Sequence, residues 1–177
     1  ISSGAWSGLL ERDLGIRIPV FPIRGQICFY DITPGHVRHM VFSSQGYMVA
    51  KRDGQLVCGA SEDLAGFDSS VTEQGIARLE AWNYQMFPFV RELPPTFKWA
   101  GLRPATQDGY PLIGMLSTDE RIIMACGHYR NGILLSPITA KIVAQLLAGK
   151  ENRTALQAFS PQRFGSVRSN SLSAFGV

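Results

Sequence analysis

The segment Asn131-Gly-Ile-Leu-Leu135 has the sequence features of an anion-binding helix entrance. Ser136 suits a helix cap, Pro137 suits the first helical position and Gly149 suits a left-handed exit, so a helix is predicted over residues 137–148. Free backbone N–H groups and the positive end of the helix dipole gather where the segment enters that helix. A negative group can bind there. The alternative, that these amides bind only their cap and water, stays open at this point.

The three cysteines, Cys28, Cys58 and Cys126, are the other side chains with reactive chemistry. Their spacing contains no Cys-x-x-Cys and matches no common metal-ligand pattern. We therefore expect buried core thiols, a reducing cytoplasmic location and no metal site.

Short strands must position most of these residues, because apolar runs alternate with Gly, Pro and Asp along much of the chain. The pair Asp53-Gly54 lies between two such runs and is a strong hairpin signal. The predicted strands cover residues 20–30, 37–42, 47–50, 56–60, 99–102, 112–113 and 122–125.

Two helices are predicted. Ser70-x-x-Glu73 fits a capping box, and apolar residues follow at helical intervals until Pro88. The final helix has an apolar stripe that we expect to face the core, formed by Ile138, Ile142, Val143, Leu146 and Leu147.

Composition indicates a globular chain. Its 177 residues are 45% hydrophobic and 18% charged, which suits one folded core. The net charge of +3 is spread without a block, so neither nucleic acid nor a membrane surface is favoured as a partner. No apolar run approaches the roughly 18 residues that a spanning helix needs. The opening Ile1-Ser-Ser-Gly4 has no methionine or basic leader, so we expect it to lie inside a longer protein.

Three blocks resemble the D-amino-acid oxidase family of FAD-dependent enzymes, and within it the glycine oxidase branch associated with thiamine biosynthesis. The blocks are Ser3-Gly-Ala-Trp-Ser7, Trp99-Ala-Gly-Leu-Arg-Pro-Ala-Thr-Gln-Asp-Gly-Tyr-Pro-Leu-Ile-Gly114 and Gly127-His-Tyr-Arg-Asn-Gly-Ile-Leu-Leu-Ser-Pro137. Their order and spacing match that branch over nearly the whole chain.

The resemblance implies an α+β fold. A mixed, largely antiparallel sheet of a flavoenzyme substrate domain would carry helices on one side, with terminal pieces of the FAD-binding domain. The implied ranges are 1–15 for the end of the FAD-binding domain, 16–100 for the substrate-binding domain, 101–160 for the return to the FAD-binding domain and 161–177 for a tail.

The resemblance also implies a reaction. FAD would take a hydride from the α-carbon of glycine or a similar small amino acid, and dioxygen would be reduced to hydrogen peroxide. One alternative is a dehydrogenase or demethylase of the same family, acting on a D-amino acid, proline or sarcosine. Another is a catalytically inert fragment that acts as an interaction module.

Three residues match substrate-binding positions of the family. Arg103, in Gly101-Leu-Arg-Pro104, would bind the substrate carboxylate, because a planar guanidinium forms two parallel charge-assisted hydrogen bonds. Tyr47 would support the same carboxylate through its hydroxyl, and Arg130 would lie near the substrate and the flavin. The alternatives are a surface arginine, a strand aromatic and an ordinary ion pair, respectively.

The last block matches the part of the family that approaches the flavin near N1 and the C2 carbonyl. Gly132 would allow the backbone to come close, and amides at the helix start would stabilise negative charge. No residue is assigned as a catalytic acid or base, because a neutral amine needs none. The implied cofactor-binding set is His128, Tyr129, Arg130, Asn131, Gly132, Ile133 and Leu134.

Some positions depart from the family pattern. Gln45 stands where a histidine is expected, and Glu62 stands where a methionine is expected. A carboxylate at Glu62 would repel a substrate carboxylate and attract its ammonium, which leaves the identity of the amine open. A cysteine before the flavin-contacting block can also attach the cofactor in a few flavin amine oxidases, but a buried thiol is the favoured interpretation of Cys126.

The chain contains no Gly-x-Gly-x-x-Gly. We therefore expect it to require a separate FAD-binding half and to hold FAD weakly by itself. The implied partners are a small amino acid, dioxygen, that FAD-binding half and further copies of the protein in a homo-oligomer.

Overall fold

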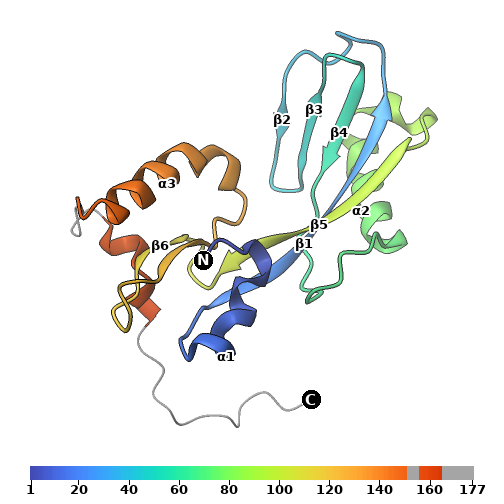
Figure 1. The fold of residues 1–177 in the computed structure, drawn as a ribbon. Helices are drawn as coiled ribbons and strands as arrows, with labels where there is room; N and C mark the ends of the chain where they lie inside the picture. The colour runs from blue at the N-terminus through green and yellow to red at the C-terminus, as the bar shows by residue number, and fades with distance from the viewer. Residues whose placement is uncertain (151–155, 165–177) are drawn as a thin grey trace. The chain divides into compact units, whose positions relative to one another are not determined.

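The computed structural model describes residues 1–150 and 156–164 and divides the chain into two compact units (Figure 1). Unit 1 comprises residues 1–21 and the chain from Arg103 onward, and unit 2 comprises Pro22–Leu102. The described elements are η1 (Gly4–Leu10), α1 (Glu11–Leu14), β1 (Val20–Asp31), β2 (Val41–Phe42), β3 (Tyr47–Ala50), β4 (Gln55–Gly59), α2 (Glu73–Met86), η2 (Pro88–Glu92), β5 (Phe97–Thr106), β6 (Leu112–Met115), β7 (Ile123–Cys126), α3 (Gly132–Leu147), η3 (Gln157–Phe159) and η4 (Pro161–Phe164).

A five-stranded sheet in the order β2-β3-β4-β1-β5 forms the framework of unit 2. The pairs β2–β3, β3–β4 and β4–β1 are antiparallel. The predicted hairpin is confirmed: Lys51 N donates to Gln55 O at 2.7 Å, and Gly54 takes a φ of +89°, which an L side chain resists. The strand predicted over 37–42 is wrong in its first part, since His36 N bonds Thr33 O in a turn and pairing begins at Val41.

Helix α2 and η2 pack on one face of this sheet. The shared core joins buried residues of β1, β3 and β4 to residues of α2 and η2: Cys28, Tyr30, Met48, Leu56, Cys58, Ile76, Leu79, Trp82 and Val90. Thr72 caps α2 by accepting from Gly75 N at 3.2 Å, so the cap predicted at Ser70 is wrong. Gln26 explains why Thr72 and not Ser70 caps the helix. Its Oε1 accepts from Thr72 N at 2.7 Å and holds Thr72 in place.

Unit 1 has its own core beneath the antiparallel β6–β7 pair. Its buried members come from the segment that enters β1, from β6 and the residue after it, and from β7: Ile18, Val20, Leu112, Leu116, Met124 and Cys126. The short helices η1 and α1 were not predicted. They are followed by Ile18, whose amide donates to Glu11 Oε1 at 2.5 Å.

Helix α3 begins at Gly132, five residues before the predicted start, and Pro137 lies inside it. Ser136 is therefore not the cap. Its hydroxyl donates to Ile133 O at 2.9 Å, and this is the carbonyl that loses a helical partner because Pro137 has no N–H. The helix continues through the proline because the neighbouring serine satisfies the freed acceptor.

The predicted core-facing stripe of α3 is only partly correct. Leu146 is buried and Ile142 and Val143 are half-buried, but Ile138 is 49% exposed and Leu147 is 73% exposed. Within the described residues, the core of unit 1 covers only one side of α3. The apolar residues of the predicted stripe extend around the helix beyond that side, so the outer ones stay exposed.

The α+β class is confirmed, with a largely antiparallel sheet and helical cover. No helix in residues 1–150 and 156–164 has the length and apolarity required to cross a bilayer. The functional assignment of each range stays a prediction, and residues 165–177 of the predicted tail lie outside the described residues.

Candidate functional site

The turn between β7 and α3 is held in a backbone conformation that its sequence makes available. Gly127 has a φ of +76°, and a Cβ at this position would lie 2.6 Å from Thr106 Cγ2. Both the backbone angle and the space require glycine. This residue brings the chain out of β7 and directs residues 128–131 toward the start of α3.

His128 joins this turn to the body of α3. Its Nε2 lies 3.0 Å from Oγ1 of Thr139, a buried residue two turns into the helix. Burial lowers the pKa of His128, so the neutral imidazole is the favoured form near neutral pH. A neutral ring with one nitrogen engaged by Thr139 can orient the turn.

Tyr129 connects the turn to the strand that carries Arg103. It takes a left-handed φ of +51°, which is uncommon for a residue with a side chain. Its amide donates to Pro104 O at 2.8 Å. Arg103 immediately precedes that acceptor, so the structure brings the backbone of the predicted substrate arginine and the predicted flavin-contacting turn together within unit 1.

The first amides of α3 have no acceptor within the helix. Leu135 N donates to Asn131 O at 2.8 Å, which leaves the N–H groups of Gly132, Ile133 and Leu134 ahead of the first intrahelical bond. Ile133 and Leu134 are 94% and 77% exposed. A Cβ at Gly132 would lie 3.6 Å from the Cβ of His128, an ordinary van der Waals distance, so packing within the chain does not require glycine there. The predicted anion-binding chemistry therefore has donors, positive dipole and access in one place.

Tyr47 lies in unit 2, on β3. It pairs with Gly59 of β4, and a Cβ on Gly59 would lie 2.8 Å from the tyrosine hydroxyl oxygen. The glycine thus leaves the space that the phenol ring occupies. Joint binding of one carboxylate by Tyr47 and Arg103 stays a prediction, since the two residues belong to different units.

The remaining predicted residues differ in exposure. Arg103 is half-buried and Arg130 is exposed in unit 1, whereas Gln45 and Glu62 are exposed in unit 2. Within the described ranges, no group of three or more His, Cys, Asp or Glu side chains lies close enough to hold a metal ion. All three cysteines are buried, as predicted.

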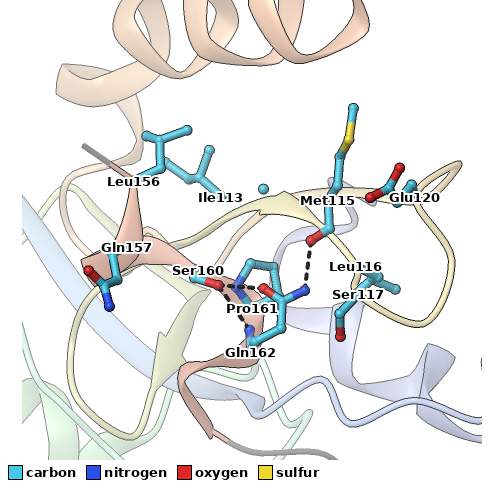
Figure 2. A pocket seen from close by; sticks show the side chains of 11 residues that line it. Ile113, Met115, Leu116, Ser117, Glu120, Leu156, Gln157, Ser160, Pro161 and Gln162 are labelled. Carbon is cyan, nitrogen blue, oxygen red and sulfur yellow. Dashed lines mark hydrogen bonds between the residues drawn. The ribbon is translucent and has the colours of Figure 1, made fainter. Parts of the chain in front are cut away.

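A separate cavity of about 480 Å³ lies in unit 1 beside β6 and the segment of η3 and η4 (Figure 2). Gln162 lines it and donates from Nε2 to Met115 O at 2.8 Å. None of the predicted substrate or cofactor residues lines this cavity, so it is distinct from the turn at the start of α3. Its lining is Ile113, Gly114, Met115, Leu116, Ser117, Glu120, Leu156, Gln157, Ser160, Pro161 and Gln162.

Sequence reasoning missed two supporting residues. Thr139 lies four residues before Val143 and seven before Leu146, on the same face of the helix, so a polar residue at a buried position was the available signal. Gly59 ends β4 without any turn signal, and its role against Tyr47 depends on strand register.

A family model described as FAD dependent oxidoreductase matches residues 1–146. The chain belongs to this FAD-dependent oxidoreductase family. Glycine oxidase of Pseudomonas aeruginosa is 34% identical over 151 residues, covering 85% of this chain and 42% of that protein. Hydrogen cyanide synthase subunit HcnC of the same organism is 34% identical over 164 residues, covering 92% of this chain and 39% of that protein.

Structural comparison agrees. The crystal structure of glycine oxidase from Geobacillus kaustophilus superposes with a TM-score of 0.86 at 34% identity, covering 92% of this chain and 44% of that chain. The chain therefore spans less than half the length of these relatives. Membership of the FAD-dependent oxidoreductase family confirms the predicted family and implies FAD as the cofactor. The amides at the α3 start suit such a group, because N–H donors and the positive end of a helix dipole stabilise negative charge.

Proposed function

We propose that the protein containing this chain oxidises glycine or a similarly small amine with FAD, producing an imine and reducing dioxygen to hydrogen peroxide. The observation that carries the proposal is the connection from Arg103 through Pro104 to the turn that opens α3. This backbone contact supports the proposal that Arg103 and the amides at the start of α3 act in one site. The glycine oxidases among the relatives support the choice of substrate.

Arg103 binds the substrate carboxylate in this proposal. A guanidinium fixes both carboxylate oxygens, so it limits rotation of a substrate that has almost no side chain. Tyr47 donates one further hydrogen bond to the same carboxylate, with its ring positioned against Gly59. Orientation of the α-carbon is the main task of these residues, because proximity and alignment lower the barrier of the bond-breaking step.

In the complete protein, the amides of Gly132, Ile133 and Leu134 would hold the flavin and would stabilise negative charge on it. FAD itself supplies the chemistry of hydride acceptance and electron transfer to dioxygen. Tyr129 and Gly127 hold this arrangement through their left-handed backbone angles.

No side chain of this chain is assigned a proton-transfer role. His128 is the obvious candidate, but its Nε2 is engaged with Thr139 and burial lowers its pKa. We propose that His128 positions the turn, and that the substrate amine binds in its neutral form.

A second candidate function is a flavin-dependent dehydrogenase of the same family. A hydrogen cyanide synthase subunit is as similar to this chain as the glycine oxidase of the same organism, so similarity does not single out the oxidase reaction. Identity at this level therefore leaves the electron acceptor open.

Anaerobic titration of the complete, FAD-loaded protein tests the substrate. Glycine, sarcosine, D-alanine and L-proline are added separately, and loss of the flavin absorbance band is followed. We expect glycine to bleach the flavin at the lowest concentration. Bleaching by L-proline or D-alanine alone would replace the proposed substrate, and bleaching by none of the four would remove the amine-oxidising function.

The 177-residue chain has no Gly-x-Gly-x-x-Gly for the pyrophosphate of FAD. We propose that it cannot retain FAD by itself. After incubation with micromolar FAD and gel filtration, the protein peak should lack flavin absorbance. Stoichiometric FAD on this chain alone would contradict the proposal that a separate half of the protein is needed to retain FAD.

A further inference from the structure

Cys28 and Cys58 are directly opposite each other in the middle of the unit 2 sheet. Strands β1 and β4 are adjacent in the sheet (Figure 1). They are antiparallel, and the two cysteines are register partners. Opposite residues in such a pair have Cα atoms about 4.5 or about 5.5 Å apart. Disulfides need Cα separations of about 4.4–6.8 Å, so the backbone of either type of pair already meets this requirement.

The pair is surrounded by polar groups that a purely apolar core would not contain. Asn83 of α2 is fully buried and its Nδ2 donates to Cys28 Sγ at 3.3 Å and to the Tyr30 hydroxyl at 3.0 Å. The Cys28 thiol also reaches the Tyr30 hydroxyl at 3.9 Å. Asn83 Oδ1 has no hydrogen-bond partner within the described residues, which makes the cluster costly to bury.

The two thiols are not equivalent. A hydrogen bond from the Cys58 thiol is the main cause that lowers the pKa of Cys28, and the Asn83 amide acts in the same direction while burial opposes both. The hydrogen bond to Cys28 and burial raise the pKa of Cys58. Cys28 is thus the better nucleophile of the pair, since the thiolate is the reactive form.

We propose that Cys28 and Cys58 form an oxidisable dithiol that hydrogen peroxide converts reversibly into a cross-strand disulfide between β1 and β4. Cys28 sulfur attacks one peroxide oxygen, the O–O bond breaks, and a sulfenic acid and one water form. Cys58 sulfur then attacks Cys28 sulfur, the S–O bond breaks and a second water leaves. Two thiols and one peroxide give one disulfide and two waters.

The source of the oxidant links this pair to the active protein. Peroxide is the product of the oxidase reaction, so this source rests on the proposed function, but the reactivity of the pair does not. Peroxide is small and uncharged, which suits entry to thiols that are fully buried. Cys58 is also followed by Gly59, the residue that makes room for Tyr47, so the cross-link would form beside a predicted substrate-binding residue.

The test treats the purified, folded protein directly with hydrogen peroxide, without amine substrate. Samples are quenched in acid, alkylated after denaturation and mapped by mass spectrometry. We expect a loss of about 2 Da from the intact mass, a peptide linking Cys28 to Cys58, and reversal by dithiothreitol. Cys126 is the internal control: it is buried in the core of unit 1, and burial raises its pKa, so it should remain alkylatable.

Three outcomes would overturn the proposal: no Cys28–Cys58 peptide while the protein stays folded, oxidation of Cys126 at the same rate, or linkage that appears only after unfolding in urea. The wild-type map does not depend on any variant folding correctly. Cys126→Ser should leave the link unchanged, and Cys58→Ser should replace it with sulfenic or higher oxidation at Cys28. Because peroxide is supplied externally, failure of the dithiol to react is distinguishable from failure of the protein to oxidise glycine.

Discussion

His128 Nε2 and Thr139 Oγ1 lie 3.0 Å apart, and their contact fastens the turn after β7 to the body of α3. Thr139→Val keeps the size of the side chain and removes its hydroxyl. We expect a loss of about 1 kcal/mol in the free energy of unfolding, the usual net value of one hydrogen bond. Urea unfolding measures it. Thr118→Val, at an exposed loop position, is the matched control and should change stability by less than about 0.5 kcal/mol.

If the same contact positions the flavin-facing amides, Thr139→Val also weakens FAD retention in the complete protein. A variant with the predicted loss of stability but unchanged FAD affinity would limit the His128–Thr139 contact to a structural role.

Gly127→Ala tests whether the turn requires glycine where it leaves β7. The new methyl would lie 2.6 Å from Thr106 Cγ2 on a backbone with a φ of +76°, so we expect destabilisation of about 1–3 kcal/mol from backbone strain and crowding. Gly101→Ala is the control, because a Cβ there meets nothing within 4 Å. Thermal unfolding of both variants gives the comparison, and equal melting temperatures would show that the turn tolerates a side chain.

Arg163 holds η4 on the loop that follows β5. Its Nε donates to Asp108 Oδ2 at 2.6 Å and an Nη donates to Asp108 Oδ1 at 3.0 Å. These bonds are the main cause that lowers the pKa of Asp108 to about 2. The folded pKa lies below the ordinary value of 3.8, so this stabilisation is present above about pH 4 and is lost as the pH falls toward 2.

Asp108→Asn should therefore be less stable than wild type at pH 7 and converge with it near pH 2. The Asp108 side chain is 35% exposed, so solvent screening limits the difference to about 1 kcal/mol. Unfolding midpoints measured from pH 7 to pH 2 test this, with Asp13→Asn, an exposed site on α1, as the control. A difference that stays constant with pH would assign the effect to something other than the carboxylate charge.

Arg103→Lys and Tyr47→Phe rank the two predicted carboxylate contacts in the complete enzyme. Lysine cannot reproduce the paired geometry, so binding of glycine should weaken by about 1.5–3 kcal/mol. Tyr47→Phe removes one neutral hydrogen bond and should cost about 0.5–1.5 kcal/mol. Substrate affinity is measured with flavin content held equal, and Arg52→Lys, in the exposed β3–β4 turn, is the control. A larger loss for Tyr47→Phe would reverse the proposed roles.

The hairpin of β3 and β4 could be predicted from sequence because Asp53-Gly54 is a local signal, and local signals need no knowledge of the fold. The start of α3 could not, because Ser136 and Pro137 look like a cap and a first turn. Their actual arrangement depends on the serine hydroxyl replacing the missing proline N–H at Ile133 O. Sequence alone gives no way to prefer one use of the serine over the other.

The candidate site divides in the same way. Gly127, Gly132 and Arg103 belong to recognisable blocks, so their positions near one turn could be anticipated. Thr139, Gly59 and the pairing of Cys28 with Cys58 depend on packing or strand register between segments distant in sequence. A one-residue slip of β4 would move Cys58 to the opposite face of the sheet, and the amino-acid composition does not determine which register forms.

Oxygen uptake and peroxide formation by the complete, FAD-loaded protein in the presence of glycine test the central claim most directly. The account predicts one peroxide per dioxygen consumed, with turnover that saturates in glycine and a much higher half-saturating concentration in Arg103→Lys. Glycine that reduces the flavin without oxygen uptake would assign the protein to the dehydrogenases, and a flavin that stays oxidised with glycine under anaerobic conditions would contradict the account.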